Sequence, residues 1–480
     1  MAQIPIGTIE DLSRIGREVD YPLNGSYVLT SDIEAFDTVN WNDGMGFEPI
    51  GTQSTPFTGQ FNGGGYVIRN LTINRQIGYV GLFAYVDQSG EIFDVGLEGG
   101  TIRGSSCNAY VGGLAGHNSG TITNSYTTCS VTVSSVSGDQ CDIHAGGLVG
   151  YNAGGIIKGT YATGSVAALS GGDEGGNGRE TFVGGLIGDN EEGDISDSYS
   201  TGAVTANISG SYVGGLIGRN GDDIKDCYAT GSVTVSTSGP LCNSCVGGLV
   251  GLGGNGSITG CYATGYVSAS SDPDSTSSNS NIRIGGLLGY SMTYCDIVQC
   301  YATGGVETAG IFTLHEAGGM AGCNAGYIAK SCARGGVKIS TPGMYASSSI
   351  GGLVGENSTG DIVNCYATGA VSGTDIAGGL VGNNYYGDVS FCYAVGSVDA
   401  FDEGGLVGIN KGSVTASFWD IDSTGQDRSA GGTGLHFEEM RWQSTYTGWD
   451  FGTVWSIRNG ATYHSSTGNG RGALHLCQMF

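Results

Sequence analysis

Proline, basic side chains and long apolar runs are all scarce in this chain. Only 7 of its 480 residues are proline, and lysine and arginine together number 18 against 44 aspartate and glutamate residues. The resulting formal net charge of −26 argues against nucleic acid or an anionic membrane as a partner. No stretch of 18 apolar residues occurs, so no transmembrane segment is predicted. The segment Met1 to Pro5 also lacks the basic and apolar parts of a signal peptide.

Glycine, by contrast, is abundant. The chain contains 92 glycine residues, yet hydrophobic residues make up 39% of it. That share is too high for a disordered glycine-rich linker, so a packed core is predicted. The 14 cysteines favour an oxidising compartment.

A Gly-Gly-Leu-x-Gly motif recurs ten times along the chain. Neighbouring copies lie between 26 residues (Leu380 to Leu406) and 38 residues (Leu148 to Leu186) apart. Such self-similarity is typical of repeat arrays, in which stacked units bury a common core. Nine copies carry leucine and one carries Met320; the leucines are Leu114, Leu148, Leu186, Leu216, Leu249, Leu287, Leu353, Leu380 and Leu406.

Three further columns keep step with the leucine: a Gly-x-Asn turn, an isoleucine or valine, and a segment whose commonest form is Cys-Tyr-Ala-Thr-Gly-x-Val. These runs are short, rich in β-branched and aromatic residues and bounded by turn formers, which indicates strands. Three short strands per repeat predict an all-β fold: a right-handed parallel β-helix of about eleven coils, with coils about 4.8 Å apart.

The asparagine of the turn is present in eight of the ten copies. Stacked in equivalent positions, these side chains predict a ladder in which each amide bonds the next, although they could serve only as turn formers. The residues are Asn118, Asn152, Asn190, Asn220, Asn324, Asn357, Asn384 and Asn410.

The residue after each leucine is also apolar, as at Val354 and Val381. Strict alternation along a strand would place it on the opposite face. We expect the glycines to bend the chain so that both columns point inward. The alternative is an exposed apolar stripe, which would be a surface for lateral self-association. Solvent exposure of Val354 and Val381 separates the two.

Six cysteines are assigned to one column, in which other copies have serine or threonine. Interchange with small residues favours buried, reduced thiols. The six are Cys227, Cys261, Cys300, Cys332, Cys365 and Cys392. Cys107 and Cys141 each precede a Gly-Gly pair by five residues in adjacent repeats, so they are the candidates for a disulfide between coils.

The ends of the array differ from its middle, as open strand edges require. Thr8 to Ile15 is predicted to be a short amphipathic helix capped by Thr8. The expected division is an N-terminal cap with the first strands (1–75), β-helix repeats (76–415), an aromatic-rich C-terminal cap (416–463) and a disordered tail (464–480). The length between the Tyr-Ala-Thr-Gly-x-Val segment and the next Gly-Gly pair varies freely, which predicts polar loops along one side of the rod.

The repeated Gly-Gly-Leu-Val-Gly, the following Asn turn and Cys-Tyr-Ala-Thr-Gly closely resemble the GLUG repeat of large bacterial and archaeal surface proteins. That family includes filamentous-haemagglutinin-like adhesins and the non-catalytic region of IgA-specific metallopeptidases. The resemblance covers residues 5–463. It implies a secreted or surface-exposed β-helix, hence an extracellular or cell-surface location, and it brings no catalytic residues.

Catalytic and metal-binding motifs are not found. A His-Glu-x-x-His helix is absent, and the six histidines are assigned to unrelated columns. Asp222 and Asp223 have the residue types of a glycosidase pair, but they fall in a turn and are interpreted as solvated carboxylates. No calcium repeat occurs, so no cofactor is expected beyond an incidental calcium ion.

Three functions are consistent with these observations. The first is a non-enzymatic surface module for adhesion or spacing, whose partners would be a host or neighbouring-cell surface, a polysaccharide or another surface protein. The second is a structural subunit of a fibre, sheath or virion appendage, which an outward Val/Ile ladder would favour. The third is a carbohydrate-active enzyme, which an aromatic and acid-lined groove would favour. The sequence favours the first, and no enzymatic activity is expected.

Overall fold

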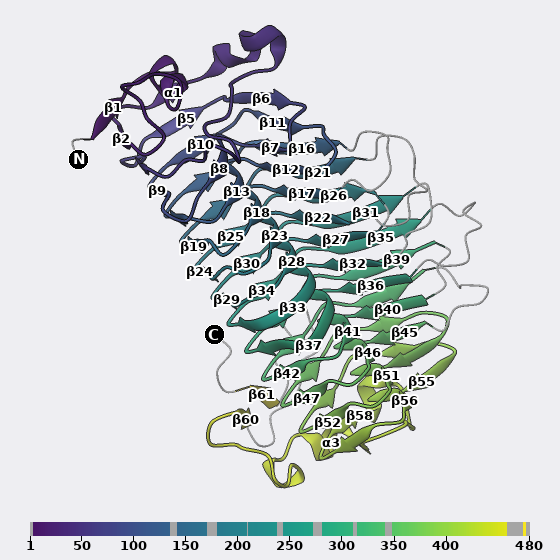
Figure 1. Cartoon of the computed structure of the whole chain (residues 1–480). Helices are drawn as coiled ribbons and strands as arrows, with labels where there is room; N and C mark the ends of the chain where they lie inside the picture. The colour runs from purple at the N-terminus through teal and green to yellow at the C-terminus, as the bar shows by residue number, and fades with distance from the viewer. Residues whose placement is uncertain are drawn as a thin grey trace.

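The computed structural model of the chain describes residues 3–134, 142–169, 180–208, 210–237, 243–271, 281–310, 314–340 and 348–457, with the backbone of Leu474–Leu476. Parallel strands stack in successive coils along one axis and form an elongated rod (Figure 1). The predicted parallel β-helix is therefore confirmed. Sheets C and D each contain eleven strands, which agrees with the predicted number of coils.

One complete coil runs through four sheets, which we call A to D. It starts with β17 (Ile143–Gly146) in sheet D, continues through β18 (Val149–Asn152) and β19 (Ile156–Lys158) in sheet A and β20 (Tyr161–Ala162) in sheet B, and ends with β21 (Val166–Leu169) in sheet C. A coil thus has five short strands where the sequence predicted three. The difference arises because two of the predicted strands are bent: one at the Gly-Gly-Leu motif and one at the Thr-Gly turn.

The strands of sheet D precede the Gly-Gly-Leu bend. They are β7 (Tyr79–Val80), β12 (Ala109–Gly112), β17, β22 (Thr181–Gly184), β27 (Ser211–Gly214), β32 (Ser244–Gly247), β36 (Asn281–Gly285), β40 (Leu314–Gly318), β45 (Ser349–Gly351), β50 (Ile376–Gly378) and β55 (Asp402–Gly404).

Sheet A contains the two strands that follow the bend in each coil. The first column is β8 (Phe83–Val86), β13 (Ala115–Asn118), β18, β23 (Ile187–Asn190), β28 (Ile217–Asn220), β41 (Ala321–Asn324), β46 (Val354–Asn357), β51 (Val381–Asn384) and β56 (Val407–Asn410). The second is β1 (Ile4–Ile6), β2 (Ser26–Leu29), β4 (Gln60–Asn62), β9 (Glu91–Phe93), β14 (Thr121–Thr123), β19, β24 (Ile195–Ser196), β29 (Ile224–Lys225), β42 (Tyr327–Ala329), β47 (Asp361–Val363), β52 (Asp388–Ser390) and β57 (Ser413–Thr415).

Sheets B and C complete each coil. Sheet B is β3 (Ile33–Glu34), β5 (Val67–Arg69), β10 (Gly96–Glu98), β15 (Tyr126–Thr127), β20, β25 (Tyr199–Ser200), β30 (Tyr228–Ala229), β34 (Tyr262–Ala263), β38 (Tyr301–Ala302), β43 (Cys332–Ala333), β48 (Tyr366–Ala367), β53 (Tyr393–Ala394), β58 (Phe418–Asp420) and β59 (Thr433–Leu435). Sheet C is β6 (Thr72–Arg75), β11 (Thr101–Gly104), β16 (Ser130–Ser134), β21, β26 (Val204–Asn207), β31 (Val233–Thr237), β35 (Val267–Ser271), β39 (Val306–Ala309), β44 (Val337–Ile339), β49 (Val371–Ser372) and β54 (Val398–Asp399).

The leucines of the repeat lie in single file at the bend between sheets D and A. The backbone N–H of Leu114 donates to the carbonyl of Leu148 over 2.9 Å, and Leu148 donates in the same way to Leu186. All nine leucines and Met320 are fully buried. Val354 and Val381 are also 0% exposed, so the bend turns both columns inward. The alternative of an exposed apolar stripe is wrong.

The last glycine of the Gly-Gly-Leu-x-Gly motif allows sheets D and A to approach closely. A Cβ atom on Gly188 would lie 2.6 Å from the backbone nitrogen of Ala145 and 2.6 Å from the carbonyl oxygen of Gly150. Real Cβ atoms do not reach such distances, because interiors are packed to van der Waals contact. The glycines of the motif are therefore required by the contact between two sheets.

The asparagine ladder is confirmed, in two separate runs of four. The side-chain nitrogen of Asn118 donates to the side-chain oxygen of Asn152 over 2.7 Å, and every later pair is joined in the same direction over 2.8 Å. The first run ends at Asn220 and the second begins at Asn324. These amides, of which all but Asn410 are buried, satisfy one another at a corner where the strand ladder does not continue.

The two coils between these runs lack the asparagine and have a different corner. Gly253 and Ser291 occupy the position, and the two sheet A strands of each coil merge into β33 (Val250–Thr259) and β37 (Leu288–Val298). The register between β33 and β37 shifts at Gly253 to Asn255. Without the amide ladder, the chain continues as one long strand around this corner (Figure 1).

Length variation is concentrated at one edge of the rod, where strands of sheet C connect to strands of sheet D. We call this the C–D edge. Residues 272–280 join β35 to β36, whereas residues 373–375 suffice between β49 and β50. The prediction that loops project along one side agrees with this connectivity.

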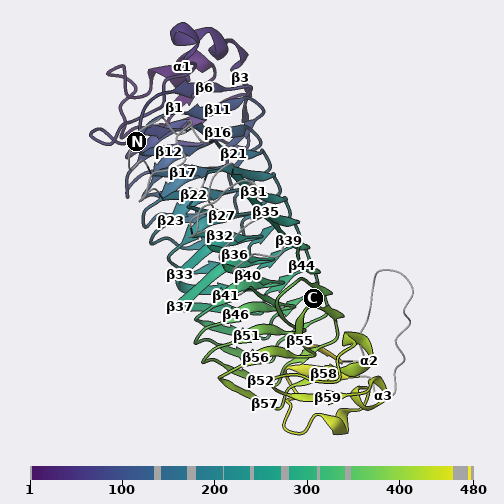
Figure 2. The same cartoon turned by 90° about the vertical axis from the view of Figure 1, so that its right-hand side faces the viewer.

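Both ends of the rod are covered. At the N-terminal end, α1 (Ile9–Arg14) buries Ile9 and Leu12, and the Thr8 side chain accepts a hydrogen bond from Asp11 N, as predicted. A stretch of turns, η1 (Phe36–Gly44), follows. At the C-terminal end, α2 (Ile421–Thr424) and α3 (Phe437–Met440) lie beside β59 (Figure 2).

The C-terminal segment then returns along sheet B through η2 (Gln443–Thr445) and β60 (Trp455–Ile457), which pairs with β61 (Leu474–Leu476). Trp449 and Trp455 are buried there. The aromatic-rich region thus covers a side of the rod as well as its end. The division at residues 75 and 415 stays a prediction, and the rest of the 464–480 tail lies outside the described residues.

Candidate functional site

Outside the core, two columns of side chains meet along the bend between sheets D and A. One column is the second residue before each Gly-Gly pair, in sheet D; the other is the residue before each ladder asparagine, in sheet A. We call this contact the D–A seam. Sheet D contributes Tyr110, His144, Phe182, Tyr212, Cys245, Arg283 and Glu316, and sheet A contributes His117, Tyr151, Asp189, Arg219, Leu252, Tyr290, Cys323 and Glu356.

Toward the N-terminus, the seam is aromatic. The ring of His144 stacks on that of Tyr110 at 4.4 Å between centroids, and both His117 and His144 contact Tyr151, at 5.2 and 5.4 Å. The assignment of these two histidines to unrelated columns is therefore wrong, because they lie on the two facing columns of one seam. Burial lowers the pKa of His117 to about 4, so His117 is neutral at physiological pH.

A buried ion pair follows in the next coils. Arg219 Nε and Nη2 donate to the two carboxylate oxygens of Asp189 over 2.8 and 2.7 Å. Asp189 is 0% exposed. The guanidinium of Arg219 also lies 4.6 Å from the ring centroid of Phe182. His144 Nδ1 is 3.3 Å from Asp189 but forms no hydrogen bond. The bidentate geometry fixes the pair as one structural unit.

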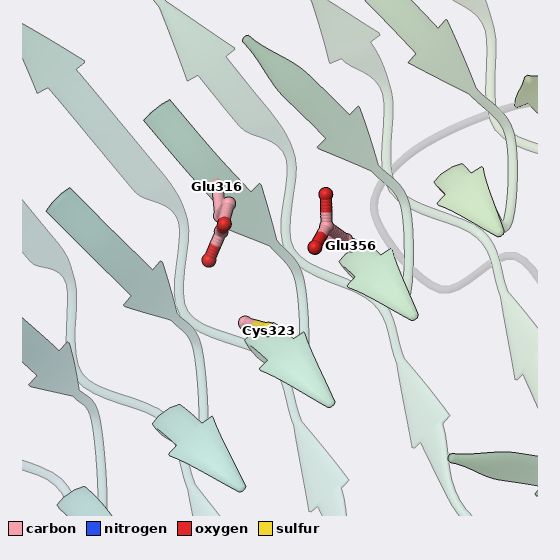
Figure 3. Close-up of side chains that lie close together, drawn as sticks. All are labelled: Glu316, Cys323 and Glu356. Atoms are coloured by element: carbon pink, nitrogen blue, oxygen red, sulfur yellow. The ribbon is translucent and has the colours of Figure 1, made fainter. Parts of the chain in front are cut away.

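A second charged cluster lies three coils further along. Arg283 Nε donates to Glu316 over 2.7 Å, and the Arg283 guanidinium lies 4.8 Å from the Tyr290 ring centroid. Glu316, Cys323 and Glu356 each place one ligand-type atom within 4.8 Å of the others. Figure 3 shows these three side chains extending from neighbouring strands.

The protonation of this second cluster follows from its burial. Burial raises the pKa of Glu316 to about 7, against the opposite effect of Arg283. Burial and then the Glu316 carboxylate raise the pKa of the Cys323 thiol well above its usual value. Burial is the largest single influence and acts to lower the pKa of Arg283, but Glu316, Cys245 and Cys323 together outweigh it, and the net shift is upward. A raised pKa of Glu316 favours its neutral acid form, whereas a raised pKa of Arg283 favours the charged pair. Burial decides the protonation of Glu316, because that side chain is only 2% exposed while Arg283 is 24% exposed.

Neither cluster has the features of a catalytic centre. A pair of catalytic carboxyls must reach a bound substrate, whereas Asp189 and Glu316 are buried and each is bonded to an arginine. A protonated, buried thiol is neither a nucleophile nor a good metal ligand. Each ion pair joins adjacent coils within one sheet, and each arginine also contacts an aromatic ring of the other sheet. Glu316 can in addition bind a proton.

Sequence reasoning missed the seam, although the repeat contained a signal for it. Aligning the copies on the Gly-Gly pair places Asp189 one coil before Arg219, and Arg283 one coil before Glu316. Opposite charges in equivalent positions of adjacent repeats predict cross-strand pairs. Both positions differ in residue type from copy to copy, whereas the leucines and asparagines recur.

The cysteine column is partly corrected by the structure. Cys227, Cys261, Cys300, Cys365 and Cys392 are fully buried and free, as predicted. Cys332 instead lies beside Tyr301 in the parallel strand register of sheet B. Ser331 takes the column position, and its hydroxyl accepts from Cys300 N over 3.1 Å. The sequence alignment of the repeats was therefore wrong by one residue in this copy, because it placed Cys332 where Ser331 lies.

The disulfide predicted for Cys107 involves a residue outside the described part. Cys107 is disulfide-bonded. Cys141, its predicted partner, is not among the described residues. The flanking residues support the prediction, because Asn108 Oδ1 accepts a hydrogen bond from Asp142 N over 3.1 Å.

The turn carboxylates at Asp222 and Asp223 lie near Asp194, with ligand-type atoms within 4.8 Å of one another. Asp223 is exposed and accepts hydrogen bonds from the backbone and hydroxyl of Ser257, at 2.7 and 2.9 Å. These contacts fit the interpretation as turn carboxylates.

A column of stacked tyrosines forms the outer face of sheet B, and we call it the tyrosine column. Neighbouring rings lie 4.6 to 4.8 Å apart between centroids, with interplanar angles of 2 to 8°. The rings are half-buried. Its members are Tyr126, Tyr161, Tyr199, Tyr228, Tyr262 and Tyr301, and after the Cys332 coil it continues with Tyr366 and Tyr393.

Comparison with known proteins identifies the repeat. The family described as the GLUG motif matches residues 142–167, 209–234, 243–268, 280–307 and 346–372. The first match runs from β17 to the start of β21, so one motif corresponds to one coil. None of the described helices has the length and apolar character needed to cross a bilayer.

Two curated proteins are similar to parts of the chain. Halomucin of Haloquadratum walsbyi is 42% identical over 115 residues, which is 23% of this chain and 1% of Halomucin. A protein of Evansella cellulosilytica, provisionally described as a Gly-rich membrane protein, is 42% identical over 82 residues, or 17% of this chain and 10% of that protein. The chain therefore matches only a small part of each relative.

A crystal structure from Bacteroides ovatus, provisionally described as an immunoglobulin A1 protease, is also similar. The superposition covers 64% of this chain and 77% of that one, with 21% identity and a TM-score of 0.39. At this level the likeness supports no assignment of activity.

Proposed function

Because this chain is a GLUG-motif repeat protein folded as a parallel β-helix, we propose that it is a non-enzymatic module of an extracellular or cell-surface protein. Its role is adhesion or rigid spacing. Polar or glycan partners bind along the C–D edge, where loops of different lengths follow one another from coil to coil.

The observation that carries this proposal is the concentration of length variation at the C–D edge. Elsewhere the coils repeat closely: the leucine column, the asparagine runs and the tyrosine column keep their spacing from coil to coil. Binding residues are commonly carried on variable loops that a rigid scaffold positions. The combination of a largely regular rod and one highly variable edge is what a surface-binding repeat protein requires.

Rigidity supports the spacer role. Strands about 4.8 Å apart give a stack of eleven coils a length of about 50 Å. Buried polar groups that bond one another along the axis resist bending, because bending would break several of them together. Such a rod would hold another domain at a fixed distance from a surface.

The charged clusters of the D–A seam support a non-enzymatic role. The seam is aromatic and contains carboxylates, as a carbohydrate-active enzyme would require, but Asp189 and Glu316 are buried against Arg219 and Arg283. The outward Val/Ile ladder that would favour a fibre subunit is absent, because these residues are buried.

Adhesion can be tested on a glycan array with the full chain and a variant in which residues 272–280 are replaced by a Gly-Ser segment of equal length. We expect wild type to bind a subset of polar glycans and the variant to lose about tenfold in affinity. A Lys158→Ala, Lys225→Ala variant on the outer face of sheet A is the matched control and should bind as wild type does.

The three parts of the proposal fail separately. Equal binding by the segment variant and wild type would remove the C–D edge from the proposal. Release of reducing sugar from any bound glycan would contradict the non-enzymatic assignment. Small-angle X-ray scattering that gave a compact or flexible particle in place of a rod would contradict the spacer role.

A further inference from the structure

We propose that the N-terminal part of the tyrosine column is a docking surface for the same column of a second copy of this chain. The five tyrosines concerned are Tyr126, Tyr161, Tyr199, Tyr228 and Tyr262. They lie on sheet B, whereas the glycan-binding edge proposed above lies between sheets C and D. The inference therefore does not depend on that function.

The surface repeats with unusual regularity. The four ring spacings are 4.6, 4.8, 4.7 and 4.8 Å, and the interplanar angles do not exceed 6°. Because the ring faces are stacked on one another, the edges and hydroxyl groups are what the column presents outward. Two residues after each tyrosine, a threonine also faces outward, at Thr128, Thr163, Thr201, Thr230 and Thr264.

These outward positions carry hydroxyl groups and no charge. A hydroxyl is both a donor and an acceptor, so two facing rows of hydroxyls can pair in either direction. Burial raises the pKa of Tyr161, Tyr228 and Tyr262, so these groups remain protonated at neutral pH. Tyr126 already donates to Glu98 over 2.7 Å. Asp197 and Asp226 flank the column and are exposed.

The same column is already covered elsewhere by an aromatic occupant. Tyr366 and Tyr393 stack at 5.0 Å and are only 4% and 3% exposed. The ring of Trp455 lies 6.4 and 5.8 Å from them, between centroids. The C-terminal segment thus shows that this face of sheet B accepts aromatic side chains from outside. Arg334, which donates to the Tyr366 hydroxyl over 2.7 Å, lies at the end of the covered part.

A second copy fits the remaining column better than another occupant does. A surface that repeats every 4.6 to 4.8 Å is matched at every coil only by a partner with the same repeat. The pairing is self-complementary, as a two-fold interface requires. Five coils span about 20 Å, so the contact is smaller than the roughly 800 Å² per partner of a stable interface. The association of two chains is therefore weak in solution, and its apparent affinity rises where many copies are attached to one surface.

Charge makes this association depend on salt. Each copy carries a formal net charge of −26, which opposes close approach at low ionic strength. At about 1 M salt the Debye length falls to about 3 Å, and the repulsion between exposed charges is largely screened. Salt has little effect on the contact between the two uncharged rows of hydroxyl groups.

The test is sedimentation equilibrium of the full chain at low and high NaCl concentration. We expect a mass of 48.8 kDa at low salt, rising toward twice that value with protein concentration at about 1 M NaCl. A Tyr199→Lys, Tyr228→Lys variant should weaken the association about tenfold or more. Thr205→Lys with Thr234→Lys, in the same two coils but on sheet C, is the control and should associate as wild type does.

A milder variant guards against loss of folding. Tyr199→Phe with Tyr228→Phe keeps the stacked rings and removes two hydroxyls, so it should weaken association by a smaller factor than the lysine variant. Wild type that stays monomeric at high salt overturns the proposal. So does equal association of the Tyr199/Tyr228 and Thr205/Thr234 lysine variants. Loss of polysaccharide binding by the tyrosine variants without any change in association would assign the column to a glycan and overturn the proposal as well.

Discussion

At the scale of single residues, the fold depends on polar side chains that are buried and satisfied by their equivalents in the next coil. Each inner asparagine of the ladder donates to the amide ahead of it and to a nearby carbonyl, as Asn190 does to Asn220 and Gly193. Removing one such residue leaves several partners unsatisfied in the interior, which is the costly case for hydrogen bonds.

We therefore expect Asn190→Ala to destabilise the protein by about 2 to 4 kcal/mol. The change removes contacts to Asn152, Gly193 and Asn220, each of 2.8 Å. Chemical or thermal unfolding followed by circular dichroism measures the loss. Asn207→Ala, at an exposed position of β26, is the control and should change stability by less than about 0.5 kcal/mol. Similar effects of the two changes would show that the ladder contributes little.

Glu316 should make stability depend on pH. Its pKa is about 7 in the folded chain and about 4.3 when exposed, so the folded state binds the proton more tightly. The corresponding stability, about 4 kcal/mol at most, is present below the unfolded pKa and is lost as pH rises through about 7. Its neighbours are Arg283, Cys323 and Glu356.

The measurement compares wild type with Glu316→Gln at pH 5, 6, 7 and 8. Wild type should lose stability relative to the variant over this range, because glutamine does not titrate. A difference between their unfolding midpoints that stays constant from pH 5 to 8 would mean that Glu316 has an ordinary pKa. Asp388→Asn, at an exposed position of β52, tests for a general effect of removing one carboxylate.

Sequence alone predicted these residues unevenly. The leucines and asparagines were found because they recur in nearly every copy, and a recurring residue type in a solenoid implies stacking. The two ion pairs were missed because each of the two seam columns contains a different residue in almost every coil. Asp189 and Arg219 lie in the sheet A column, and Arg283 and Glu316 lie in the sheet D column. Pairing across coils depends on which two copies are neighbours, and not on any residue type being repeated.

At the scale of elements, the bend between sheets D and A determines how each coil closes. The motif was predicted as one strand, but its second glycine and leucine lie between two strands, as between β22 and β23. Sequence periodicity showed that both Leu186 and Ile187 are apolar. The glycines predicted a bend, but not that the bend joins two different sheets, because that depends on the backbone contact at Gly188.

We expect Gly188→Ala to be strongly destabilising, by about 3 kcal/mol or more. The new methyl group would meet the backbone of Ala145 and of Gly150 at 2.6 Å, and neither strand can move without disturbing its neighbours. Gly336→Ala is the control, since the nearest atom to its Cβ is the Ala370 carbonyl oxygen at 3.4 Å. Unfolding midpoints should fall for the first variant and remain unchanged or rise slightly for the second. Equal midpoints would contradict the close approach of the two sheets.

At the scale of the whole molecule, the rod is held at its C-terminal end by a segment that returns along sheet B. Trp455 is 0% exposed, and its indole N–H donates to Asn364 over 3.1 Å. Trp455→Ala should lower the stability of this segment by about 3 to 5 kcal/mol while the remaining coils stay folded.

Hydrogen exchange measures this local effect. Faster exchange is expected in residues 437–457 of the Trp455→Ala protein and little change in sheet C. Trp442→Ala, at a side chain that is 48% exposed, should exchange as wild type does. Uniformly faster exchange throughout the Trp455→Ala chain would indicate that the rod unfolds as a single cooperative unit.

Contacts between successive coils also make each coil a removable unit. The second glycine of every pair occupies the same position in its coil, so excising residues 148–185 would join Gly147 directly to Leu186. The Asp189–Arg219 and Arg283–Glu316 pairs lie outside the excised stretch, and Asn118 would then donate to Asn190. We expect the shortened chain to fold, with its long dimension in solution scattering reduced by about 4.8 Å. A protein built in this way can change its reach by gaining or losing whole repeats, without redesign of the parts that remain.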